Sequence, residues 1–208
     1  MTPQELLRRA LDPATDENER YLLVAAAISL ATGQTFVLVG GAATNLHMGS
    51  YRPTDVDLVG PRLRGADEAA LMALGFARRG RHLVLRSSDG LIEIPVEFPG
   101  YRLFSYMKGP NARYEVRPGT FAEVAAVTDL MMDRVVQVAD GTPSTLADAV
   151  GLAVAAYRDI DWDELEFRAK EESIDIGGEA FEVLEDTLKK VRRQAVALIR
   201  RAPEPGES

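Results

Sequence analysis

The sequence predicts an α/β (α+β) fold, with a sheet-containing N-terminal domain followed by an all-helical C-terminal region. Short β-branched runs, such as residues 36–39, alternate with helical stretches in the first half of the chain. An Asp-Gly pair at residues 89–90 separates two alternating apolar segments, which is typical of a β-hairpin. Beyond residue 119, apolar positions recur at helical spacing. We therefore expect domains at 1–118 and 119–202, and a disordered tail at 203–208.

Start and stop signals define the individual elements of the first half. Thr2 and Pro3 are typical of a helix start, whereas Gly33 and Gly75 are typical of a helix end. Together with the apolar patterns, these signals predict helices at 5–11, 21–32, 42–48 and 66–74, and strands at 36–39, 55–59, 81–86 and 91–98.

The composition limits the classes of chemistry available to the chain. The 208 residues are 46% hydrophobic and 27% charged, as in a folded globular protein. The absence of cysteine excludes disulfides and thiolate chemistry, and only two histidines argue against a histidine-rich zinc centre. No signal core or transmembrane span is evident, so we expect no membrane partner and a cytoplasmic location. The net charge of −8 argues against general adhesion to nucleic acid but allows a local basic groove.

The most informative stretch runs from Phe36 to Val59. Gly40-Gly41 follow the first strand and precede a short helix, so the backbone can approach a phosphate and the helix N-terminus offers N–H groups to it. In the next strand, Asp55 and Asp57 project from one face. Neighbouring carboxylates repel unless a cation separates them, and oxygen ligands suit Mg²⁺ (or Mn²⁺) bound together with substrate phosphates.

Each of these features has a simpler interpretation when it stands alone. A glycine pair after a strand is usually a tight turn, and an Asp-x-Asp strand is usually a solvated edge. In this order and spacing, with Arg52 and Thr54 between them, the two features favour a site for metal and a nucleoside triphosphate.

The pattern Gly40-Gly41 followed by Asp55-Val56-Asp57 resembles the signature of the nucleotidyltransferase superfamily with the polymerase-β-like fold. The longer pattern, residues 39–43 and 52–58, most resembles the AbiEii-like and minimal nucleotidyltransferase branch, many of whose members are toxins of toxin–antitoxin pairs. Gly41 stands where the superfamily often has a serine, which removes one hydroxyl contact to phosphate. The resemblance implies a nucleotidyltransferase-fold mixed sheet flanked by helices.

The resemblance also implies roles for individual residues. Asp55 and Asp57 would hold the metal, and the nucleotide would contact Gly40, Gly41, Ala42, Arg52 and Thr54. A third carboxylate, acting as metal ligand or general base, is expected on a neighbouring strand. Glu97 is the first choice and Glu93 the second, and the alternative is that both are solvent-facing residues of an amphipathic strand.

Two further segments allow a functional and a structural interpretation. AbiEii-like relatives carry an Asp-Lys or Asp-Arg pair facing the nucleotide, and Asp133-Arg134, in a helix predicted at 121–139, resembles it. The alternative is an exposed ion pair. Residues 100–119 mix aromatic and basic side chains, which could stack a base and bind phosphates but more often mark a loop whose rings pack on the core.

The last predicted helix, residues 179–201, carries an apolar stripe on one side. On the other side lies the densest positive patch of the chain: Lys189, Lys190, Arg192, Arg193, Arg200 and Arg201. This patch is either a solvated face that complements the helix C-terminus or a groove wall for a nucleic-acid backbone.

The resemblance implies a Mg²⁺-dependent enzyme that moves a nucleoside monophosphate from a triphosphate to an acceptor, which would be tRNA or protein. A toxin role with a cognate antitoxin would follow from the same branch. Two alternatives stay open: a catalytically degenerate nucleotide-binding module, and a protein-interaction module built around the final helix.

Overall fold

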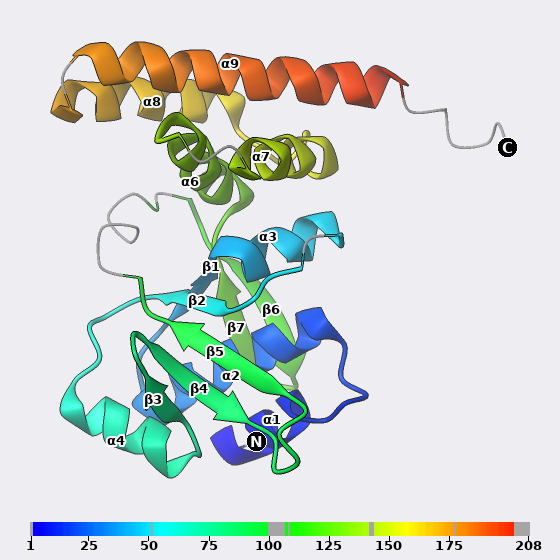
Figure 1. The fold of residues 1–208 in the computed structure, drawn as a ribbon, viewed down its shortest axis with the longest axis vertical. Coiled ribbons are helices and arrows are strands. Elements are labelled where there is room, and N and C mark those ends of the chain that lie inside the picture. Colours follow the sequence, from blue (N-terminus) through cyan, green and yellow to red (C-terminus); the bar gives the residue numbers. More distant parts are fainter. Residues whose placement is uncertain are drawn as a thin grey trace, which may run out of the picture. The chain divides into compact units, whose positions relative to one another are not determined.

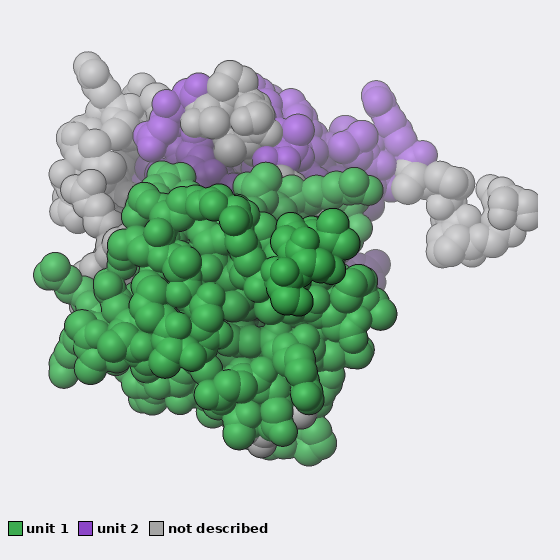
Figure 2. Space-filling view, turned by 60° about the horizontal axis from the view of Figure 1, so that its bottom comes forward, with its two compact units in different colours: residues 1–126 green, residues 127–208 purple. Residues whose placement is uncertain are grey.

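The structure is a computed structural model that describes residues 2–50, 52–99, 107, 109–141, 144–176 and 178–201; for residues 144–145, 172–176 and 178–183 it describes the backbone alone. The chain forms two compact units, Met1–Ala126 and Val127–Ser208 (Figure 2). The predicted domain ranges, 1–118 and 119–202, stay a prediction. Among the described residues, no helix combines the length and the apolar character needed to cross a membrane.

The first unit is built on a seven-stranded sheet with strand order β3-β4-β5-β2-β1-β7-β6 (Figure 1). Strands β1–β7 and β2–β5 pair in parallel, and the other neighbours are antiparallel. The predicted mixed α/β fold is therefore confirmed. The strands are β1 Val37–Val39, β2 Val56–Val59, β3 Ala77–Arg79, β4 His82–Arg86, β5 Glu93–Glu97, β6 Ala112–Arg117 and β7 Thr120–Val124.

The four predicted helices of the first unit are confirmed, with small shifts at their ends. They are α1 Pro3–Ala10, α2 Glu17–Thr32, α3 Gly40–Met48 and α4 Gly65–Ala73. Thr2 caps α1 through a reciprocal pair of hydrogen bonds with Glu5. Helix α2 begins four residues earlier than predicted because the Asp16 carboxylate accepts the N–H groups of Asn18 and Glu19.

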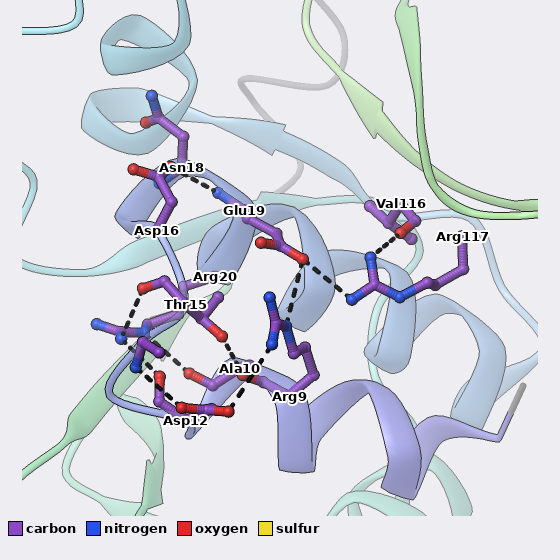
Figure 3. Close-up of polar contacts among 11 residues, drawn as sticks. Arg9, Ala10, Asp12, Thr15, Asp16, Asn18, Glu19, Arg20, Val116 and Arg117 are labelled. Atoms are coloured by element: carbon purple, nitrogen blue, oxygen red, sulfur yellow. Dashed lines mark hydrogen bonds and ion pairs between the residues drawn. The ribbon is translucent and has the colours of Figure 1, made fainter.

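A polar network connects α1 to α2 (Figure 3). The Arg20 guanidinium donates to the carbonyl oxygens of Ala10, Asp12 and Thr15 at 2.9, 3.2 and 3.1 Å, which satisfies carbonyls left open where α1 ends. Glu19 pairs with Arg9 at 3.5 Å and, from β6, with Arg117 at 3.1 Å. These contacts fix the start of α2 relative to the sheet.

The helix predicted at 121–139 is wrong in its first part, because residues 120–124 form strand β7 and helix α6 begins at Val127. Thr120, Ala122 and Val124 are buried, whereas Phe121 is 37% exposed, so side chains alternate with the period of a strand. Gly119, at φ +73°, ends the tight turn from β6.

Strands β3 and β6 were not predicted. Because β6 occupies residues 112–117, the expectation of a loop is wrong for that part of the 100–119 segment. The base-stacking alternative rested on aromatic and basic residues of this segment. Most of them lie outside the described residues: Tyr101, Arg102, Phe104, Tyr106 and Lys108. The other two, Arg113 and Tyr114, lie in β6, where Arg113 pairs with Glu123 of β7 at 2.9 Å.

The second unit consists, in its described part, of helices α6 Val127–Ala139, α7 Ser144–Ala155, α8 Trp162–Ile176 and α9 Gly178–Arg201. Asp129 of α6 forms a buried ion pair with Arg168 of α8, and Arg168 also pairs with Glu164 at 2.7 Å. On α9, the predicted apolar stripe is buried from Leu184 to Ala195, but Leu198 is 49% exposed. The stripe therefore packs along most of its described length and leaves the end of the helix in solvent.

Candidate metal and phosphate site

The turn from β1 into α3 is fixed by Gly40. This residue has φ +63°, a conformation that favours glycine, and a Cβ placed on it would lie 2.1 Å from Oδ2 of Asp57. Any other side chain would therefore displace the Asp57 carboxylate or strain the turn. Helix α3 starts at this glycine, so the carboxylate lies beside the helix N-terminus, where Gly41 and buried Ala42 form the first turn.

Strands β2 and β5 bring the predicted acidic residues to one face of the sheet. Asp57 is level with Val39 of β1 on one side and with Glu97 of β5 on the other. Asp55 precedes Asp57 by two residues and shares its face, while Val56 and Leu58 are fully buried on the opposite face. Three carboxylates from two neighbouring strands thus face the same side.

His82, at the start of β4, completes a cluster with two of these carboxylates. Ligand atoms of Asp55, His82 and Glu97 all lie within 4.8 Å of one another. His82 Nε2 is 3.3 Å from Oε2 of Glu97 and 3.9 Å from Oδ2 of Asp55. All three side chains are half-buried, with exposures between 19% and 28%, so solvent can reach the cluster. These donors are close enough to share one cation.

The two candidates for the third carboxylate have different surroundings. Glu97 contacts His82 and forms an ion pair with Arg81, whose Nε lies 3.1 Å from Oε2 of Glu97. Glu93 is more exposed and pairs with Arg79 of β3 at 3.2 Å and with Arg86 of β4. Of the two, only Glu97 lies in the cluster, so the alternative that both merely face solvent does not describe Glu97. Its role as a third catalytic carboxylate stays a prediction.

The remaining predicted site residues lie at different places. Arg52 and Thr54 are exposed on the segment before β2, and the Thr54 hydroxyl is 3.4 Å from Oδ1 of Asp55. Arg134 lies on α6, in the second unit, and is only 6% exposed; its Nη1 donates to Gln137 at 2.9 Å. Burial raises the pKa of Asp133, although Arg134 and Gln137 oppose this. Asp133-Arg134 is therefore not the exposed ion pair of the alternative.

Sequence reasoning missed His82, Arg81 and Tyr21. A two-residue turn at 89–90 pairs positions that are equidistant from it, so counting back from the turn would have placed His82 opposite Glu97. The observed register of Leu83 with Val96 agrees with that count. The sequence therefore contained the signal for His82, but using it requires the register of the hairpin in addition to the prediction that a hairpin forms.

Tyr21 ties the segment before Asp55 to helix α2. Its hydroxyl donates to Glu17 Oε1 at 2.9 Å and lies 3.3 Å from the carbonyl oxygen of Pro53. Burial, together with Glu17, raises the pKa of Tyr21 well above its ordinary value, so the phenol stays protonated. No local pattern indicates this contact, because the two residues are 32 positions apart in the chain.

No protein-family model and no curated protein matches the chain. Among solved structures, an antigenic nucleotidyltransferase-like protein from Paracoccidioides brasiliensis is similar over 66% of this chain and 76% of its own, with 15% identity and a TM-score of 0.51. JHP933 from Helicobacter pylori is 14% identical over 95% and 90% of the two chains, with a TM-score of 0.46. The antibiotic-resistance factor ANT(2'')-Ia is 14% identical over 95% and 96%, with a TM-score of 0.39.

At this level of identity, the first similarity concerns the fold alone. It shows that this chain has the mixed α/β fold of a nucleotidyltransferase-like protein. What the acidic cluster does on that fold must be argued from its own geometry.

Proposed function

We propose that this protein is a divalent-metal-dependent nucleotidyltransferase, which transfers a nucleoside monophosphate from a nucleoside triphosphate to an acceptor and releases pyrophosphate. One observation carries the proposal: Asp55, Asp57 and Glu97 share one face of the sheet, beside the glycine turn that opens α3. Metal ligands and phosphate-binding N–H groups are needed side by side for this reaction.

The donor set suits a hard divalent cation. Asp55, Asp57 and Glu97 supply carboxylate oxygens, which Mg²⁺ and Mn²⁺ prefer, and the cluster at Asp55 and Glu97 is compact enough for one ion. His82 contacts Glu97 and would orient it, as hydrogen-bonded partners of metal ligands do. When bound, the ion would neutralise charge on the triphosphate and so favour attack on the α-phosphorus.

The other residues would position the substrates. The N–H groups at Gly40, Gly41 and Ala42 would bind triphosphate oxygens at the start of α3. Arg52 is exposed close to Asp55 in sequence and would pair with a phosphate, and Thr54 would orient Asp55. Glu97 would accept the proton of the acceptor hydroxyl if it does not bind the metal.

The identity of the acceptor rests on sequence alone. The pattern at residues 39–43 and 52–58 resembles the AbiEii-like branch, which favours tRNA or a protein as acceptor and a toxin role with a cognate antitoxin. Arg134 would contact the nucleotide only if its buried guanidinium became accessible, so we assign it a lesser weight than Arg52.

A second candidate function is a nucleotide-binding module without turnover. Glycine at position 41, where a serine hydroxyl is common in the resembled superfamily, and the burial of Arg134 both favour it, because each removes a contact to phosphate. Retention of both aspartates on β2 opposes it.

The test is incubation of the protein with Mg²⁺, each α-labelled nucleoside triphosphate and total bacterial tRNA. We expect label in the RNA or on protein, reduced at least about a thousandfold in Asp55→Ala/Asp57→Ala because the metal ligands are lost. The matched control is Asp140→Ala/Asp159→Ala, which removes two exposed carboxylates elsewhere and should retain activity. Nucleotide binding without transfer would favour the binding module; absence of nucleotide binding would overturn both functions.

A further inference from the structure

The end of helix α9 concentrates positive charge in an otherwise acidic chain. Residues 189–201 contain six lysine or arginine residues and no aspartate or glutamate, whereas the whole chain has a net charge of −8. The helix macrodipole favours cations only in the last turn. It therefore accounts for Arg200 and Arg201, but not for the four cations between Lys189 and Arg193, which lie two turns or more from the helix end.

Part of this charge surrounds a hollow of about 840 Å³ in the second unit. Its lining comes from α9 and from Glu166 of α8, and Leu188, Val196 and Ala197 supply apolar surface. The α9 residues between Asp186 and Arg200 that do not line the hollow, such as Val191 and Ala195, lie on the other side of the helix, so the hollow follows one side of α9. Its cations are Lys189, Lys190, Arg192, Arg193 and Arg200, and among the described residues its acids are Glu166 and Asp186.

The cations of the hollow fall into two groups. Lys189 pairs with Glu185 at 2.6 Å, and Arg192 pairs with Glu166 at 3.0 Å. The second group is Lys190, Arg193 and Arg200, which are exposed and make no ion pair within the described part of the chain. We call these three residues the α9 row. Their charge is open to a ligand.

We propose that the α9 row binds the phosphate backbone of a nucleic-acid strand. At about 1.5 Å per residue, Lys190 and Arg200 are about 15 Å apart along the helix, a span that covers several consecutive phosphates of one strand. Each guanidinium group can donate two parallel hydrogen bonds to the oxygens of one phosphate. Val196 and Ala197, which lie between Arg193 and Arg200, offer apolar contact to sugars or bases. Lys190, Arg193 and Arg200 lie three and seven residues apart on one side of α9, and such a line of cations favours a strand that carries a phosphate at every nucleotide over an acidic protein segment.

This inference does not rest on the proposed function, since α9 would bind nucleic acid whether or not the sheet transfers a nucleotide. The test measures fluorescence anisotropy of labelled RNA and DNA strands of about 20 nucleotides with the full chain, between about 50 and 200 mM salt. Three phosphate contacts predict a slope of log K against log salt of about −2.

The decisive variant is Lys190→Glu/Arg193→Glu/Arg200→Glu, for which we expect at least a tenfold loss of affinity and a flatter salt dependence. The matched control, Arg8→Glu/Arg62→Glu/Arg158→Glu, changes the net charge equally at exposed arginines elsewhere and should stay within about threefold of the wild type. If the first variant fails to fold, the glutamine triple at the same positions replaces it.

Equal loss in both charge-reversal variants would show that only overall charge matters and would overturn the proposal. The proposal would also be overturned if neither strand binds at about 50 mM salt. Binding of poly-glutamate in place of either strand would overturn it in favour of an acidic protein partner. Comparison of the RNA and DNA arms tells which nucleic acid is preferred. Binding that persists when no nucleotide transfer is detected would separate this proposal from the proposed function.

Discussion

Two charged clusters of this molecule contain similar residues but differ in how their charge is compensated. In the second unit, Asp129 is buried against Arg168, which also pairs with Glu164. In the first unit, the carboxylates of Asp55 and Glu97 lie beside His82, and Glu97 also pairs with Arg81, whose side chain is 72% exposed.

The difference separates a structural role from a binding role. A buried ion network supplies its own counter-charge and is costly to disrupt, whereas an incompletely compensated, half-exposed cluster leaves its charge available for a ligand. The α9 row is likewise exposed and uncompensated within the described part of the chain, but its charge is positive and so is available for an anionic ligand. The predictions below either break or sharpen this contrast.

The largest effect on stability is expected for Asp129→Ala. The substitution removes the buried partner of Arg168 and leaves its ion pair with the partly exposed Glu164, and it should lower the free energy of unfolding by about 3 kcal/mol. Glu164→Ala is the matched control and should cost less than about 1 kcal/mol, because Glu164 is 36% exposed. Urea unfolding of both variants measures this. Equal costs would contradict the structural role of the buried pair.

Gly40→Ala should reduce nucleotide transfer about a hundredfold, because its Cβ would displace the Asp57 carboxylate. Gly33→Ala is a matched control, since Gly33 has nearly the same positive φ, +65°, but nothing within 4 Å of its Cβ position. Both variants should lose about 1 to 2 kcal/mol of stability from the left-handed conformation. If transfer falls equally in both, the close approach of Asp57 to Gly40 is irrelevant to activity.

Glu97→Gln should weaken Mn²⁺ binding about tenfold or more, because Glu97 lies in the cluster with Asp55. Glu93→Gln, on the same strand, should leave Mn²⁺ affinity unchanged, since Glu93 pairs with Arg79 and Arg86 instead. Calorimetric titration compares the two variants. A larger loss of Mn²⁺ affinity in Glu93→Gln than in Glu97→Gln would show that Glu93, and not Glu97, is the third carboxylate of the site.

The smallest effect concerns Asp133, which is only partly compensated. Its pKa is raised in the folded state, so the folded protein holds this proton more tightly than the unfolded chain. The contribution of Asp133 to the stability of the fold is therefore fully present below the pKa that Asp133 has in the unfolded chain. This contribution is lost as the pH rises through the pKa that Asp133 has in the folded protein. Asp133→Asn should remove this loss and flatten the profile of melting temperature against pH above about pH 4. An unchanged profile would contradict the assignment.

The local parts of the fold and site could be predicted because their signals are contiguous. The strand, glycine turn, helix and Asp-x-Asp strand between residues 36 and 59 each depend on neighbouring residues, and all four elements are confirmed. Strand β7 was missed because its five residues run directly into the apolar pattern of α6. Its alternation becomes recognisable only once β1 and β6 are known to pair with it.

The rest of the site depends on contacts between distant residues. His82 lies beside Asp55 and Glu97 only through the register of three strands, and Tyr21 reaches Pro53 across the packing of α2. No pattern within one segment encodes such contacts. The burial of Arg134 is likewise set by tertiary packing, which a helical pattern does not reveal.

The most direct test of the central claim is Mn²⁺ binding, counted by electron paramagnetic resonance with and without a non-hydrolysable nucleoside triphosphate analogue. We predict that the protein binds Mn²⁺ at the sheet and binds it more tightly with the analogue. Asp55→Asn/Asp57→Asn should abolish this binding while the melting temperature stays the same or rises, because carboxylate repulsion is relieved. Mn²⁺ binding that is unchanged in this variant, or no binding by the wild type with the analogue present, would contradict the account.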